Sequence, residues 1–102
     1  MPNEYTIIVG RHIDPGAQYI GRGSPLGNPF VISIHGNRME VCQKYKTWFY
    51  REIRIEEPIL MTELQRLLKI LIEKKTITLG CFCSPKQCHG ETVKEYLLSK
   101  LS

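Results

Sequence analysis

Four residues that can bind a metal or exchange electrons lie close together near the end of the chain, in GCFCSPKQCHG: Cys81, Cys83, Cys88 and His89. Thiolates and imidazole are zinc ligands, and a thiol at the start of a helix can be redox-active. The spacing differs from the paired C-x2-C pattern of structural zinc sites. We therefore favour buried structural thiols and expect no cofactor, with zinc binding and a redox role for Cys88 as the alternatives.

His89 and Gly90 stand where a predicted strand, a tight loop and a helix meet. The first backbone N–H groups of a helix lack partners within it, so this corner suits an anion. The imidazole could contact that anion or transfer a proton, or it could hydrogen-bond a backbone carbonyl of its own loop. The candidate catalytic residues are His89 and Glu91, and the candidate ligand-binding residues here are Ser84, Cys88, His89 and Gly90.

A second unusual segment is GRGSPLGNPF, residues 21–30. Its three glycines and two prolines exclude a regular helix or strand. Arg22 could bind a phosphate with two parallel hydrogen bonds or pair with a local carboxylate, and Asn28 could read a base or ribose edge or cap the loop. The segment is neither a P-loop nor a GxGxxG motif. Arg22, Gly23, Ser24 and Asn28 are its candidate ligand-binding residues.

Three strands are predicted to position these loops. The apolar run EYTIIVG at residues 4–10 ends in glycine, which is typical of a central parallel strand. Arg11 and His12 follow it directly and are further ligand-binding candidates. Residues 19–20 predict a brief second strand, and the β-forming residues 76–79 predict a third just before the cysteines.

Three helices are predicted from apolar spacing. The first begins with a capping-box pair, Asn37 and Glu40, and runs to about residue 53. The second begins at Pro58 or Thr62, and the third follows Gly90.

The order strand, loop-rich strand, helix, helix, strand, helix predicts an α/β protein with a small, mostly parallel sheet flanked by helices, a Rossmann-like sandwich. A chain of 102 residues has room for one core, so residues 1–102 should form a single ligand-binding domain. Ligands of such sheets bind beyond the carboxyl ends of the strands. The loops after the first and third strands should meet there, with residues 21–30 closing over them.

Two of the predicted helices carry apolar residues that could contact a ligand or a second copy of the chain. Aromatic side chains of the first helix could stack on a base, although helical spacing favours core packing for most of them and places Tyr50 off the buried stripe. These are Tyr45, Trp48, Phe49 and Tyr50. In the second helix, Ile70 and Ile72 widen a leucine stripe beyond the needs of one small core, which favours a homo-oligomer.

Composition points to a soluble protein with anionic partners. The net charge of +4 and the pI near 9.0 favour nucleotides and phosphorylated metabolites. No basic run exceeds Lys74-Lys75, so we do not expect nucleic acid. No apolar run approaches the ~20 residues that cross a bilayer, and the N-terminus lacks a signal pattern. We expect a cytoplasmic protein with no membrane partner.

Two motifs together resemble the signature of a small family catalogued as a domain of unknown function, whose members occur in phages and bacteria. They are YIGRGSPLGNPF at residues 19–30 and GCFCSPKQCHGETV at residues 80–93. Tyr45 and Trp48 match the aromatic pattern of that family, which commonly has Asp where this chain has Glu91. The family is similar to compact Rossmann-like domains that bind nucleotides, which is an analogy of fold.

These observations favour binding of a nucleotide or nucleotide-derived anionic small molecule. The resemblance to a family with phage members suggests that this binding would sequester the molecule. In a phage this would counteract nucleotide signalling in the host cytoplasm. One alternative is an enzyme acting on a nucleoside or nucleotide, with His89 and Glu91 in acid-base roles. Another is a metal- or nucleic-acid-binding accessory protein. The sequence leaves the choice between binding and catalysis open.

Overall fold

The chain forms a small sheet flanked by helices in a computed structural model that describes residues 4–81 and 89–101. The elements in chain order are β1 (Thr6–Arg11), β2 (Gln18–Tyr19), α1 (Arg38–Arg54), α2 (Pro58–Lys74), β3 (Thr76–Cys81) and α3 (Gly90–Leu101). This order confirms the predicted α/β architecture with a parallel sheet.

The sheet has the strand order β1-β3-β2, and both pairings are parallel. β1 runs beside β3 along its whole length, from Thr6 opposite Thr76 to Arg11 opposite Cys81. The sequence prediction of β1 as a central strand is wrong, because β3 occupies the centre and β1 an edge. The exposure of Ile8 agrees with this edge position, because an apolar side chain of β1 is 49% exposed there. The final residues of β3 are all buried.

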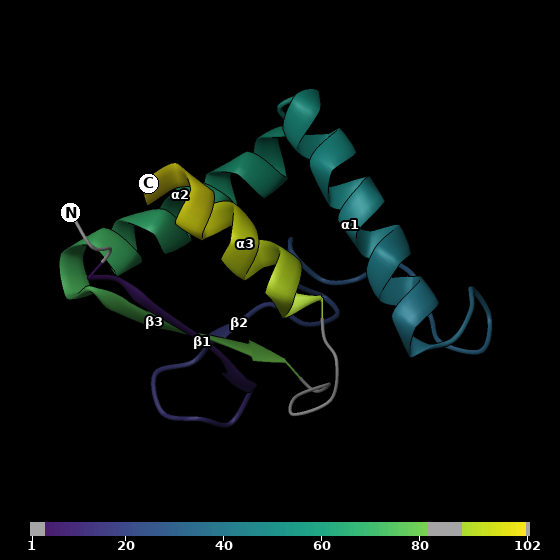
Figure 1. Ribbon diagram of the computed structural model, residues 1–102, viewed down its shortest axis with the longest axis horizontal. Helices are drawn as coiled ribbons and strands as arrows, with labels where there is room; N and C mark the ends of the chain where they lie inside the picture. The colour runs from purple at the N-terminus through teal and green to yellow at the C-terminus, as the bar shows by residue number, and fades with distance from the viewer. Residues whose placement is uncertain (1–3, 82–88, 102) are drawn as a thin grey trace.

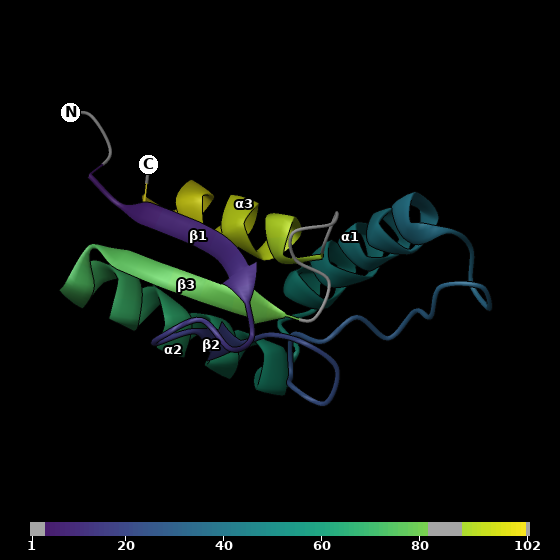
Figure 2. The same cartoon turned by 90° about the horizontal axis from the view of Figure 1, so that it is seen from below.

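Helices cover both faces of the sheet. α3 lies over one face and α2 over the other, so the layers run helix, sheet, helix (Figure 2). α1 stands beyond the carboxyl end of β3, to one side of these layers (Figures 1 and 2). The carboxyl edge of the sheet therefore faces a third helix.

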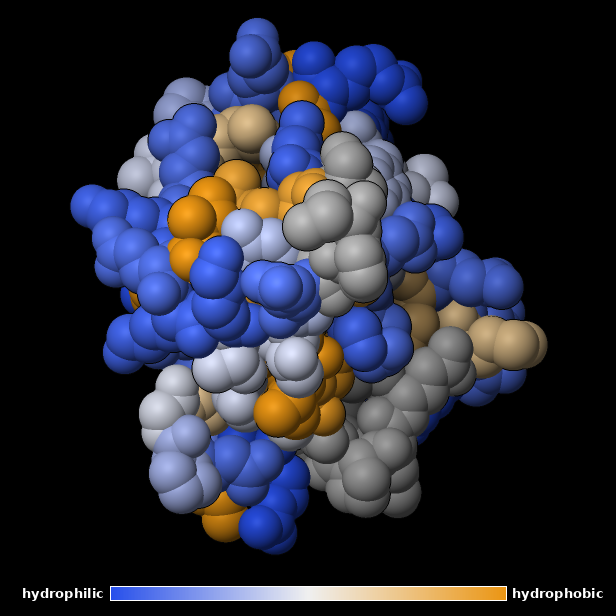
Figure 3. Space-filling model, turned by 60° about the vertical axis from the view of Figure 1, so that its left-hand side comes forward, coloured by the Kyte–Doolittle hydropathy of each residue, from blue (hydrophilic) through white to orange (hydrophobic). Residues whose placement is uncertain are grey.

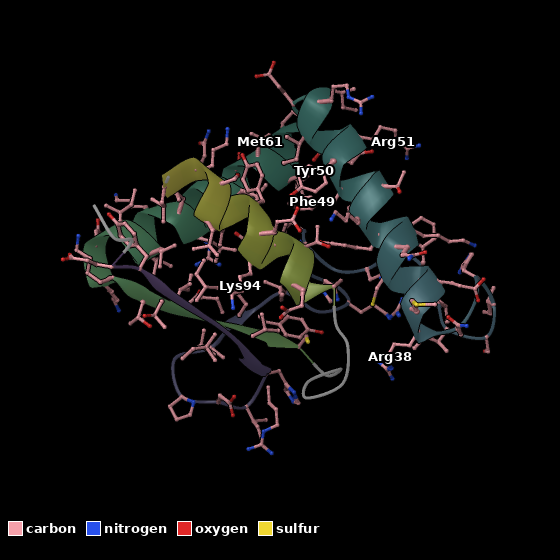
Figure 4. The ribbon with its side chains drawn as sticks, in the orientation of Figure 1. Arg38, Phe49, Tyr50, Arg51, Met61 and Lys94 are labelled. Atoms are coloured by element: carbon pink, nitrogen blue, oxygen red, sulfur yellow. The ribbon has the colours of Figure 1, made fainter. Side chains whose placement is uncertain are left out.

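Aromatic side chains hold α1 against α3. Phe49 and Tyr50 lie between the two helices, with Met61 of α2 nearby (Figure 4). The Phe49 and Tyr96 rings meet edge to face at 5.7 Å, and the Tyr50 hydroxyl donates to Glu95 at 3.1 Å. Burial and the Glu95 carboxylate raise the pKa of Tyr50 to about 12, so the phenol keeps the proton that it donates.

α1 and α2 begin where side chains satisfy their first N–H groups. Asn37 caps α1, and its side chain and that of Glu40 exchange hydrogen bonds of 2.9 Å with the backbone, as the sequence predicts. α2 begins at Pro58, because the Glu57 carboxylate accepts from Leu60 N at 2.7 Å. The alternative start at Thr62 is therefore wrong.

Tyr45 joins α1 to the glycine- and proline-rich loop. Its buried hydroxyl donates to the Leu26 carbonyl at 2.8 Å. We expect Tyr45→Phe to lower the free energy of unfolding by about 1–3 kcal/mol, because the buried carbonyl loses its donor. Urea unfolding measures this loss. Tyr50→Phe is the matched control, since its partner Glu95 is exposed and can bind water; equal losses in the two variants would contradict this role of Tyr45.

The apolar arc of α2 is only partly exposed. Leu68 and Ile70 pack against the core, while Ile72 is 46% exposed. On the face shown in Figure 3, apolar side chains form separate small groups among hydrophilic ones. A homo-oligomer therefore stays a prediction. Within the described ranges, none of the helices combines the length and the apolar character that crossing a membrane requires.

Candidate functional site

A cavity of about 260 Å³ lies beyond the carboxyl end of β3. It is bounded by the glycine- and proline-rich loop, the following segment, the start of α1, the end of β3 and the residue before α3. The described lining residues are Gly21, Arg22, Asn28, Phe30, Val31, Ile32, Arg38, Val41, Cys42, Cys81 and His89. Described residues from both of the sequence segments that were expected to share one pocket thus line this cavity: Gly21, Arg22 and Asn28 from the first, and Cys81 and His89 from the second.

The loop over the cavity is held by hydrogen bonds within it. Ser24 Oγ donates to the Gly21 carbonyl at 2.7 Å, and the Tyr19 hydroxyl donates to the Arg22 carbonyl at the same distance. Asn28 accepts from Phe30 N at 2.8 Å and donates to the Val41 carbonyl at 3.3 Å. Asn28 therefore caps the loop and ties it to α1, which is the structural alternative named for it.

His89 fastens the start of α3 to this loop. Its Nε2 lies 2.6 Å from the Ile20 carbonyl oxygen, and its ring centroid lies 4.8 Å from that of Tyr45. Because a carbonyl can only accept, Nε2 carries the proton. The side chain is buried, and this burial lowers the pKa of His89; the nearby Arg22 charge acts in the same direction. The imidazole is therefore neutral at pH 7.

The lowered pKa of His89 predicts acid sensitivity. The unfolded chain binds a proton at this residue near its ordinary pKa of about 6.5, whereas the folded chain resists protonation until a lower pH. This part of the stability is complete above about pH 6.5 and is lost as the pH falls, by at most about 1.4 kcal/mol per pH unit. Urea unfolding at several pH values measures the slope.

We expect His89→Gln to reduce this slope, while His12→Gln, at an exposed position, should retain it. An unchanged slope in His89→Gln would contradict the assignment.

The cavity is electropositive. Arg22 and Arg38 both line it, and no carboxylate does so among the described residues. Arg22 donates to the Asn28 carbonyl at 3.4 Å, and within the described ranges its guanidinium has no ion pair. Arg38 is the first residue of α1, and His89 directly precedes α3, so the positive ends of two helix dipoles also face this region.

Several predicted site residues lie outside the described lining of the cavity. Arg11 is exposed, and its Nε lies 3.4 Å from the Asp14 carboxylate. His12 is exposed, and its backbone N–H donates to Cys81 O at 3.2 Å. Glu91 is exposed in the first turn of α3. Gly23, Ser24 and Gly90 shape the adjacent backbone but do not line the cavity.

The remaining predictions concern the cysteines and their loop. Ser84, Cys83 and Cys88 lie outside the described residues. Cys81 is buried and Cys42 half-buried, and both line the cavity. In the part of the chain that the structure describes, no group of three or more His, Cys, Asp or Glu could hold a metal ion.

Comparison with protein-family models matches residues 8–99 to a family described as "Domain of unknown function (DUF4326)". The chain belongs to the DUF4326 family. The match confirms the prediction that the chain belongs to a family of unknown function. No curated protein and no solved structure matches the chain.

In this DUF4326 chain, Arg38 is the main site candidate that sequence reasoning missed. The spacing of α1 predicts which of its faces is apolar, but not that its first turn borders the cavity. One signal was present: Asn37 marks the start of this helix, and a basic residue directly after it adds charge at the positive end of the helix dipole.

Proposed function

We propose that this protein binds a nucleotide or nucleotide-derived anionic small molecule in the cavity between the loop at residues 21–30, α1 and His89. The observation that carries the proposal is the pairing of two guanidinium groups with an apolar wall in one cavity. Arg22 and Arg38 supply positive charge that suits a phosphate, since arginine can bind phosphate through two parallel hydrogen bonds.

The apolar wall supports the organic part of such a ligand. Phe30, Val31, Ile32 and Val41 contribute aromatic and branched aliphatic surface. Ligand sites combine such surface with a few charged groups that fix orientation, and usually have volumes of about 300–1,000 Å³. The cavity of about 260 Å³ is close to the lower end of that range. It suits a ligand of about the size of one nucleotide unit.

Holding the ligand fits the described residues better than converting it. General acid-base catalysis needs titratable groups within hydrogen-bond reach of the substrate. Glu91 is exposed outside the described lining, and His89 uses Nε2 to bind the Ile20 carbonyl. In a phage, such binding would sequester a nucleotide signal of the host. An enzyme acting on a nucleotide is the alternative.

Calorimetry with AMP, GMP, CMP and UMP, each beside its nucleoside, tests the proposal. We expect at least one monophosphate to bind about 10-fold or more tightly than its nucleoside, because charged hydrogen bonds contribute about 1.5–3 kcal/mol each. Mass spectrometry after long incubation should recover that nucleotide unchanged. The proposal fails if no nucleotide binds, or if nucleosides bind equally well. A converted nucleotide would favour the enzyme.

A further inference from the structure

A second hollow of about 380 Å³ adjoins the cavity on the outer side of α1. Its described lining residues are Phe30, Glu40, Gln43, Lys44, Thr47, Trp48 and Arg51. Phe30 lines both hollows, so this residue stands at their boundary. We call the second hollow the α1 groove.

The α1 groove offers an aromatic surface for stacking. Trp48 is half-buried, and its ring lies 5.5 Å from that of Tyr45, which is itself fully buried. Contact with the buried ring limits the mobility of the indole. Trp48 and Phe30 together line the α1 groove with two aromatic rings. Such aromatic surfaces stack with nucleobases of any type.

The groove also carries positive charge. Lys44 and Arg51 line it against a single carboxylate, Glu40, which is engaged with the backbone N–H of Asn37 at 2.9 Å. The Lys44 ammonium donates to the backbone carbonyl of His35 at 2.6 Å. Arg51 projects from α1 on the side away from α3 (Figure 4), and its Nη2 lies a loose 3.8 Å from Glu52.

We propose that the α1 groove binds the second unit of a dinucleotide whose first unit occupies the cavity. This inference rests on the proposed function and extends it from one nucleotide to two. One phosphate would lie at Arg22 and Arg38, the linking phosphate would pass Phe30, and the second base would stack on Trp48 within reach of Lys44 and Arg51. The cavity and the α1 groove each combine cationic side chains with apolar or aromatic ones, and Phe30 lies between them. A dinucleotide likewise alternates phosphates with bases, so its two units suit the two hollows.

The test compares AMP, GMP, CMP and UMP with the matching 5′-phosphorylated dinucleotides pApA, pGpG, pCpC and pUpU. For the base that binds best, we expect the dinucleotide to bind roughly 10-fold or more tightly than the mononucleotide, the gain from one stacked base. Trp48→Leu should remove most of that gain and leave mononucleotide affinity unchanged.

Because Trp48 also packs on Tyr45, the exposed Arg51 provides a second variant. Arg51→Gln should reduce dinucleotide affinity several-fold without changing mononucleotide affinity. Arg54→Gln, on the same helix but outside the described lining of the groove, should change neither. If dinucleotides bind no better than mononucleotides, or if Trp48→Leu and Arg51→Gln leave their advantage intact, the inference is overturned and the proposed function stands. If neither kind of ligand binds, both are overturned.

Discussion

The double variant Arg22→Gln/Arg38→Gln is expected to abolish nucleotide binding while the protein remains folded. Both side chains line the cavity, and each charged hydrogen bond to a phosphate contributes about 1.5–3 kcal/mol. Loss of both should weaken binding of the best mononucleotide by roughly 100-fold or more. Calorimetry measures the affinity, and thermal unfolding shows that the fold is retained.

The matched control is Arg54→Gln/Lys69→Gln, which removes the same charge from two exposed positions outside the described lining of the cavity. It should bind like the unmodified protein. If both double variants lose affinity equally, the net charge and not the cavity attracts the ligand, and the site is misplaced.

Gly27→Ala should cause the largest loss of stability among the substitutions considered. A Cβ at this position would lie 2.5 Å from the Gly21 carbonyl oxygen and 3.0 Å from Arg22 Cα. Both atoms belong to the backbone, so no side-chain rotation relieves the clash. We expect a cost of about 2–3 kcal/mol, which for a domain of this size lowers Tm by about 10–20 °C. Nucleotide affinity should fall as well, because Arg22 is displaced.

Gly10→Ala provides a graded comparison. A Cβ there would lie 2.5 Å from Asp14 Oδ2, but that atom ends a side chain that can turn toward solvent. Its loss of stability in the same thermal scans should be clearly smaller. An equal or larger loss for Gly10→Ala would mean that the close approach of Gly27 to Gly21 does not hold the loop.

Local interactions made much of the fold predictable from the sequence. The capping pair Asn37 and Glu40 marks the start of α1, and Pro58 was one of two predicted starts of α2, because both act through neighbouring backbone groups. The position of β1 was not predictable in this way. Its apolar run resembles a central strand, yet pairing with β3 alone leaves Ile8 half-exposed at an edge.

The candidate site was predicted in part, for a similar reason. Glycines and prolines around Arg22 signalled a shaped loop, and the strand-loop-helix pattern located His89 beside it. Arg11 is the last residue of β1 and lies opposite Cys81 of β3, but its side chain pairs with Asp14. Arg38 comes to the cavity only because α1 packs beyond the sheet, which depends on long-range contacts such as Tyr45 with Leu26. Spacing along the sequence does not encode those contacts.

The most direct test is an NMR titration of the isotope-labelled protein with the mononucleotide that binds best. We expect the amide resonances of Arg22, Phe30, Arg38 and Val41 to shift together and to saturate at one ligand per chain. The amide resonances of residues at the opposite end of the sheet, such as Thr6 and Thr76, should not move. Shifts absent from the cavity residues, or centred on Arg11 and His12, would contradict the central claim that this cavity is the nucleotide site.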